Sequence, residues 1–305
     1  MHHPFFGKLL VSIATMAALG VSSPPVSAAP ILHHVHGLAF TTDGKALVVP
    51  AHTGLAIYRD GRWSLAPGPA HDFMGFSVTI AAIYTSGHPA PGSPLRNPLG
   101  LIKSTDGGKT WQQLSLYGEA DFHNIAVGYQ TNVVYVINGG ANSQMPEAGI
   151  YYTRNGGKTW KRSESVGIIS PITGIAAHPS DPAMVAVSTF GGVYLSRDFG
   201  RQFRRFSQEK AVTAVSFELD AKHLLFASEG ESALVRIALD GGSNQSLKLP
   251  ALAPDVVTYI AQNPANRKEI AIATRKRHVF ISKDAGNTWK QIAKNGEDSH
   301  AARRR

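Results

Sequence analysis

Short runs of alternating apolar and polar residues recur along the chain, and each run ends at a turn rich in glycine. Residues 149–152 (Gly-Ile-Tyr-Tyr) and residues 278–281 (His-Val-Phe-Ile) are two examples. Alternation with a period of two is typical of a β-strand, because successive side chains point to opposite faces of a sheet. The turn after each run therefore predicts a β-hairpin. No stretch after residue 28 predicts a helix of ordinary length.

The turns share the pattern S/T-x-D/N-x-G-x-T-W. It occurs at residues 104–111, 153–160 and 282–289, and a worn copy at residues 196–203 ends in Phe. The Asp or Asn accepts hydrogen bonds from the amides of the turn, and the Gly takes the positive φ that a tight turn needs. The Trp supplies a large apolar face that packs beneath the turn. The residues expected in these structural roles are Asp106, Trp111, Asn155, Trp160, Asp198, Asp284 and Trp289.

The turn positions repeat along the chain. With degenerate copies at residues 58–63 and 238–242, the series of turn residues is Asp60, Asp106, Asn155, Asp198, Asp240 and Asp284. The spacings are 46, 49, 43, 42 and 44 residues, and such a period with about four strands per repeat predicts a β-propeller. We therefore predict an all-β fold, a β-propeller of about six four-stranded blades over residues 29–295. A seventh blade would require a divergent repeat hidden in a long loop.

The two ends of the chain have compositions of their own. A weakly basic start ending at Lys8, an apolar run at residues 9–19 and small residues before Ala28 are typical of a secretory signal peptide over residues 1–28. The apolar run is too short to span a bilayer. We expect a periplasmic or secreted protein that is not an integral membrane protein, with a basic C-terminal tail over residues 296–305.

Composition limits the chemistry further. The chain has no cysteine, which excludes thiol catalysis and thiolate metal sites and leaves core burial to hold an exported domain together. The net charge is +9, and the basic residues cluster only at residues 275–277 and 303–305. Because we expect export, nucleic acid is not an expected partner. Contact with another envelope protein or an anionic envelope polymer fits better.

Candidate chemistry gathers at the starts of the innermost strands. The aligned positions are His36, Met74 and His123 in the first three repeats, and threonine in the other three. Residues two positions earlier point the same way along a strand. The loops between second and third strands lie on the same face of a propeller. The residues expected at this mouth of the central channel are His34, His36, His52, His71, Asp72, Met74, His88, Asp121 and His123.

Imidazoles grouped with a thioether and carboxylates are typical of a metal site. A Met ligand beside His suits copper, Cu(I) especially, whereas His with Asp alone suits zinc. The two Asp residues could instead orient the imidazoles, and each His could simply cap a strand end. We predict a copper site with His36, Met74 and His123 as inner ligands, with zinc as the alternative metal. His178 and His223 fall in loops of the opposite face, and we interpret them as structural.

The turn motif resembles the Asp-box, or BNR sialidase-type repeat, of sialidases, the sortilin luminal domain and photosystem assembly factors. Residues 34–40, 71–77, 87–94 and 116–123 resemble exported bacterial propellers that carry a glycosyl hydrolase or exo-sialidase label. A sialidase needs three arginines, a Tyr nucleophile paired with Glu, and an Asp acid/base. The arginine motif expected near the mature N-terminus is absent from residues 29–34.

The functional hypothesis is therefore an exported, non-catalytic propeller that binds a metal ion, copper before zinc. Two alternatives stay open. The first is a sialidase-like glycoside hydrolase, and the second is a protein-interaction scaffold of the sortilin or photosystem-assembly type.

The leader gives the first prediction. We expect the mature protein to lack residues 1–28, because small residues precede the cleavage site at Ala28. The intact mass of protein from a periplasmic extract measures this, and a mature species that still carries Met1 would contradict it.

Overall fold

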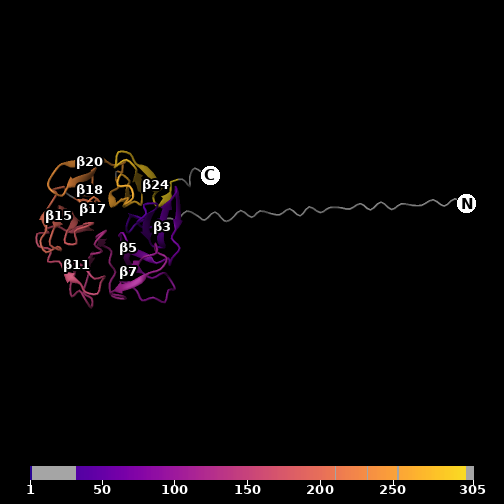
Figure 1. Ribbon diagram of the computed structural model, residues 1–305, viewed down its shortest axis with the longest axis horizontal. Coiled ribbons are helices and arrows are strands. Elements are labelled where there is room, and N and C mark those ends of the chain that lie inside the picture. Colours follow the sequence, from indigo (N-terminus) through magenta and orange to yellow (C-terminus); the bar gives the residue numbers. More distant parts are fainter. Residues whose placement is uncertain (2–31, 210, 232, 253, 300–305) are drawn as a thin grey trace.

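The computed structural model describes residue 1 and residues 32–299, apart from residues 210, 232 and 253. The chain forms six antiparallel sheets, which follow one another round a ring in sequence order (Figure 1). Apart from residue 1, the expected leader lies outside the described residues. Within the described part of the chain, no helical segment has the length and hydrophobicity that a bilayer span requires.

Each sheet is one blade, built from consecutive strands. The first three blades are β1 (Ala39–Phe40), β2 (Leu47–Ala51), β3 (Gly54–Arg59) and β4 (Arg62–Leu65); β5 (Asp72–Val78), β6 (Ile83–His88), β7 (Leu101–Ser104) and β8 (Gln112–Ser115); and β9 (Ile125–Val127), β10 (Val134–Asn138), β11 (Gly149–Thr153) and β12 (Lys161–Arg162). The last three are β13 (Ile172–Ala177), β14 (Val185–Thr189), β15 (Gly192–Ser196) and β16 (Arg204–Arg205); β17 (Val212–Phe217), β18 (His223–Ser228), β19 (Ala233–Ala238) and β20 (Asn244–Lys248); and β21 (Val257–Gln262), β22 (Ile270–Thr274), β23 (Val279–Ser282), β24 (Lys290–Lys294) and β25 (Glu297–Asp298).

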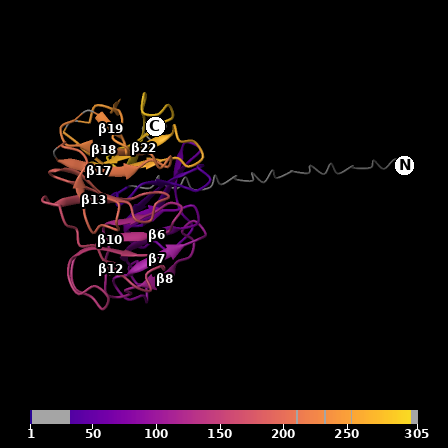
Figure 2. The same cartoon turned by 60° about the vertical axis from the view of Figure 1, so that its left-hand side comes forward.

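The sequence prediction of an all-β propeller with six four-stranded blades is confirmed for the described residues. The first strands of neighbouring blades contact one another round the ring, and β21 contacts β1 to close it. Figure 2 shows β6, β7 and β8 side by side in the second blade. The last sheet gains a fifth strand, β25, which lies in the segment that the sequence assigned to the tail.

The second strand of a blade lies deepest in the protein. All residues of β2, β14 and β22 are buried, because both faces of a blade pack against neighbouring blades. Strands covered on both faces have nearly continuous apolar sequences rather than alternating ones, as in Ile-Ala-Ile-Ala-Thr of β22. The apolar clusters lie between blades. For example, Val48 and Leu55 of the first blade join Phe73 and Phe76 of the second.

The turn motif holds itself together with side-chain hydrogen bonds. The carboxylate of Asp106 accepts from the backbone N of Thr110 at 3.0 Å, from the Thr110 hydroxyl at 2.6 Å and from the Ser104 hydroxyl at 2.8 Å. These bonds lower the pKa of Asp106 to about 2. The residue after the Asp has a positive φ even where it is not glycine, as at Phe199 (61°) and Ala285 (58°).

The tryptophans at these turns reach back to the preceding blade. The indole N–H of Trp160 donates to Ser115 Oγ at 2.9 Å, and that of Trp289 donates to the carbonyl of Lys248 at 2.8 Å. Trp63 of the first blade donates to the carbonyl of Ile292 in the last blade at 2.9 Å. The same type of contact that joins neighbouring blades therefore also closes the ring.

Ring closure gives the second prediction. Trp63 is 8% exposed, and its replacement by Ala should lower the free energy of unfolding by about 3–5 kcal/mol, because a cavity opens between the first and last blades. Trp63→Phe is the matched control. It keeps most of the apolar volume and should cost roughly 1–2 kcal/mol, mainly through the lost hydrogen bond. Urea unfolding measures both, and equal stability of the Ala variant and the wild type would contradict this role.

Candidate metal centre

The six inner strands surround a central channel with a cavity of ≈ 400 Å³. Its wall is formed mainly by residues of the inner strands and is about equally polar and apolar. His36, His123, Phe190 and Arg275 also line it. Among the described residues that line the channel, Arg275 is the only arginine and none is a carboxylate.

Three histidines of the first blade converge at one mouth of this channel. His34 and His36 precede β1, and His52 lies in the turn between β2 and β3. The antiparallel pairing of β1 with β2 brings these segments together, and the backbone N of His36 donates to the carbonyl of Pro50 at 3.3 Å. One ligand nitrogen from each histidine lies within 4.8 Å of the other two. The ring centroids are 4.6 to 5.6 Å apart.

A carboxylate of the neighbouring blade fixes one of these rings. His52 Nδ1 lies 2.6 Å from Asp72 Oδ1, and Asp72 begins β5. Metal-binding histidines commonly donate one ring N–H to a carboxylate, which sets the tautomer and orients the other nitrogen. With Nδ1 donating to Asp72, His52 carries its lone pair on Nε2, the nitrogen that remains to bind an ion.

One ring nitrogen of His36 has no hydrogen-bonding partner. Its Nε2 is buried and has no hydrogen bond. Burial, with smaller contributions from His52, His34 and His123, lowers the pKa of His36 to about 4, while Asp72 opposes the shift. His36 is therefore neutral at neutral pH, the form that binds a metal ion. A buried nitrogen without a partner is uncommon in folded proteins, and a bound ion would satisfy it.

A second group of polar side chains lies beside the first. Asp121 Oδ2 is 2.7 Å from His123 Nε2 and 3.2 Å from His88 Nε2, and His88 Nδ1 is 2.7 Å from Asn97 Oδ1. The ring centroids of His36 and His123 are 6.5 Å apart and nearly perpendicular, which joins the two groups. The carboxylate orders both imidazoles at the rim. This group extends the polar mouth round to the third blade.

Met74 does not occupy the position expected from the repeat. It is 7% exposed and is not among the residues that line the channel, whereas Phe76 and Ser77 of the same strand are. The pairing of β5 with β6 shifts register between Phe73 and Phe76. The inner strands of the last three blades have the same shift, and their threonines do line the channel, so the shift does not explain the position of Met74. Of the three expected inner ligands, the structure brings His36 and His123 to the channel but not Met74.

His71 is also separate from the converging group. It is 5% exposed, and its Nδ1 accepts the backbone N–H of Ala90 at 2.9 Å. That bond anchors the proline-rich loop after β6. His71 therefore has a structural partner. His52, which the sequence placed in the loop between the second and third strands, belongs to the triangle of imidazoles formed by His34, His36 and His52.

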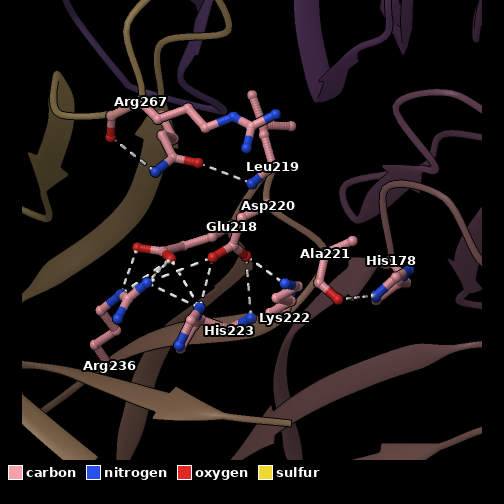
Figure 3. A network of polar contacts seen from close by, with 10 residues as sticks. His178, Glu218, Leu219, Asp220, Ala221, Lys222, His223, Arg236 and Arg267 are labelled. Carbon is pink, nitrogen blue, oxygen red and sulfur yellow. Dashed lines mark hydrogen bonds and ion pairs between the residues drawn. The ribbon is translucent and has the colours of Figure 1, made fainter.

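The opposite face holds a second polar cluster that the sequence did not reveal (Figure 3). Glu218, Asp220 and His223 also place ligand atoms within 4.8 Å of one another. However, the guanidinium of Arg236 donates to Glu218 at 2.8 to 3.0 Å and lies 3.4 Å from Asp220. A permanent cation already balances these carboxylates, so the cluster is an ion-pair network. His178 nearby, with its Nε2 3.1 Å from the carbonyl of Ala221, is structural as expected.

Comparisons with known proteins agree with the architecture. A family model described as photosynthesis system II assembly factor YCF48 matches residues 30–302. No curated protein matches the chain.

The chain aligns with several solved structures. A GH74 enzyme of Niastella koreensis aligns with a TM-score of 0.58 at 16% identity, over 87% of this chain and 46% of that chain, so this chain spans less than half of that enzyme. A nidogen/laminin complex aligns with a TM-score of 0.58 at 11% identity, over 81% of this chain and 92% of that chain. A structure titled "YCF48 bound to D1 peptide" aligns with a TM-score of 0.42 at 12% identity, over 74% and 81% of the two chains. At these identities the first two likenesses show the fold alone.

The neutral state of His36 gives the third prediction. Its pKa is about 4 in the folded protein, against 6.5 for an unperturbed histidine, so the unfolded chain binds the proton first as pH falls. Stability of the metal-free protein should therefore be full above 6.5 and decrease as pH falls toward about 4. His36→Asn should lessen this decrease, measured by urea unfolding across the interval. The exposed His33→Asn is the control and should keep the wild-type pH dependence; equal slopes for both variants would contradict the assignment.

Proposed function

The chain belongs to the family of the photosynthesis system II assembly factor YCF48, and from this premise we propose an exported, non-catalytic binding propeller whose histidine mouth holds a transition-metal ion. The ligands are His34, His36 and His52. The observation that carries the proposal is the buried, unpartnered Nε2 of His36 within a triangle of three imidazoles. Asp72 supports the triangle from the next blade by orienting His52.

Copper is the proposed ion, and zinc is its rival. The expectation of Cu(I) depends on a Met thioether among the ligands, and Met74 does not line the channel. Three imidazoles suit either metal, but nitrogen ligands bind Cu(II) more tightly than the other divalent ions of the first transition row. Three protein ligands also leave a coordination position open, as in metal sites that take an exogenous ligand.

The family name also supports a protein partner, since it describes an assembly factor. The mouth with the histidines carries features of a docking face. Phe190 is 56% exposed at the turn between β14 and β15, and Ile169, 81% exposed, lies just before β13. By the topology of a blade, both positions share the face on which the histidines lie. We therefore include an envelope protein as a partner of the same face.

The glycoside hydrolase alternative has weaker support from the site. A sialidase needs three arginines to hold a carboxylate, and acidic groups beside the scissile bond. Among the described residues, the channel lining offers Arg275 alone and no carboxylate. The likeness to a GH74 enzyme at 16% identity concerns the fold. These residues do not supply a hydrolytic mechanism.

The metal site gives the fourth prediction. Copper titration of metal-free protein against a competing chelator should show tight binding that weakens as pH falls, because protons compete for the imidazoles. A His36→Ala/His52→Ala double variant should lose more than about a hundredfold in affinity, and Asp72→Asn should lose about 10- to 100-fold.

His223→Ala is the matched control, because it removes an imidazole from the rival cluster on the opposite face. It should bind copper as the wild type does. Equal affinity of the double variant and the wild type, or a loss confined to His223→Ala, would refute the site.

A further inference from the structure

The face opposite the histidine mouth is basic. In each blade, the turn between the first and second strands and the turn between the third and fourth strands lie on this face. In every blade but the fifth, these turns and the strand ends beside them carry more Lys and Arg than Asp and Glu. Around the histidines, by contrast, carboxylates such as Asp72 and Asp121 offset the basic side chains. We call the surface opposite the histidines the basic face.

The positive charge is densest where the third and fourth blades meet. The turn motif of the third blade has Asn155 in place of an aspartate, so this turn carries Arg154 and Lys158 without a carboxylate of its own. The exposed cations of this seam are Arg154, Lys158, Lys161, Arg197, Arg201 and Arg204. The carboxylates beside them are half as many, namely Glu164, Asp181 and Asp198. Of the cations, Arg201 alone forms an ion pair within the described part of the chain, 3.7 Å from Asp198.

An aromatic stack holds one of these cations in place. The guanidinium of Arg154 lies 5.5 Å from the centroid of the Phe199 ring, and that ring stacks on Tyr152 with the centroids 4.8 Å apart. Phe199 has a φ of 61°, at a position where residues 107 and 156 of the other turns are glycine. A bulky residue in this conformation is an outlier, and such outliers cluster at functional sites. The stack thus fixes a guanidinium at the seam, where no carboxylate pairs with it.

Exposed apolar side chains lie on the same face. Val166 is more than half exposed, and its backbone N donates to the carbonyl of Arg201 at 3.1 Å, which places it beside the cations of the seam. Ile80 is also more than half exposed, in the turn between β5 and β6, and its backbone N donates to the carbonyl of Tyr129 in the corresponding turn of the third blade. Cations beside exposed apolar side chains are typical of a surface that binds the interface of an anionic bilayer.

We propose that the basic face docks the protein on a bilayer that contains anionic phospholipid. Arg154, Lys158 and the neighbouring cations contact lipid phosphates, and Val166 enters the interface. The cations spread over two blades, and none of them lines the channel or the pocket beside Glu218, which fits a planar surface better than a small anion. In this orientation the histidine mouth faces away from the bilayer. The inference does not depend on a bound metal ion.

Co-sedimentation of metal-free protein that lacks residues 1–28 with lipid vesicles tests the docking. The protein should bind phosphatidylcholine vesicles only when they contain phosphatidylglycerol, and binding should weaken as salt screens the charges. Arg154→Gln/Lys158→Gln should weaken binding about 25-fold, roughly fivefold for each charge. Arg275→Gln/Lys276→Gln is the matched control, because it removes the same charge from an exposed turn of the histidine face, and it should bind as the wild type does. Equal binding of the two double variants would overturn the inference.

A second measurement keeps every charge in place. The chain has no cysteine, so a polarity-sensitive fluorophore can be attached at a single introduced thiol. At Val166→Cys its emission should shift to the blue and intensify on anionic vesicles, whereas at Phe190→Cys, on the histidine face, it should stay unchanged. A response at Phe190→Cys, or none at Val166→Cys, would overturn the inference. Binding to the soluble polyanion heparin without binding to anionic vesicles would overturn it too, because the basic face would then serve a different partner.

Discussion

Packing between neighbouring blades is the interaction on which the rest of the structure depends. A four-stranded sheet has two faces, and in this protein both are covered only when the next blade is present, as the fully buried β2, β14 and β22 show. The turn tryptophans extend this packing by reaching back to the preceding blade. The ring therefore closes without a strand exchanged between the first and last blades. The indole N–H of Trp63 donates to the carbonyl of Ile292, and the backbone N of Leu32 donates to the carbonyl of Gly296 at 2.7 Å.

The closed ring brings together the side chains of the proposed metal site. His34 and His36 come from the segment before β1, His52 from the turn after β2, and Asp72 from the next blade. Their convergence therefore requires two packed blades and the pairing within one of them. Side chains held this way are already in position for the proposed ion, as an effective metal site needs. The burial that stabilises the ring also keeps His36 neutral. The packing of neighbouring blades thus both stabilises the fold and produces the arrangement of the proposed site.

The repeat made the architecture predictable, because each copy of the turn motif marks one blade. The same alignment correctly placed His36 and His123 at the channel. Met74 belongs to the same series but is not among the residues that line the channel. The alignment also gave no sign that Ala90 satisfies His71, or that Arg236 reaches Glu218 from two strands away. Periodicity predicts the order of strands, whereas these contacts depend on pairing and loop geometry that sequence spacing alone does not encode.

Anomalous X-ray diffraction from crystals of the copper-loaded protein, collected at the copper edge, tests the central claim most directly. The account predicts one strong peak at the mouth of the channel, about 2 Å from a ring nitrogen of each of His34, His36 and His52. A peak beside Glu218 and His223 on the opposite face, or no peak within bonding distance of these three imidazoles, would contradict it.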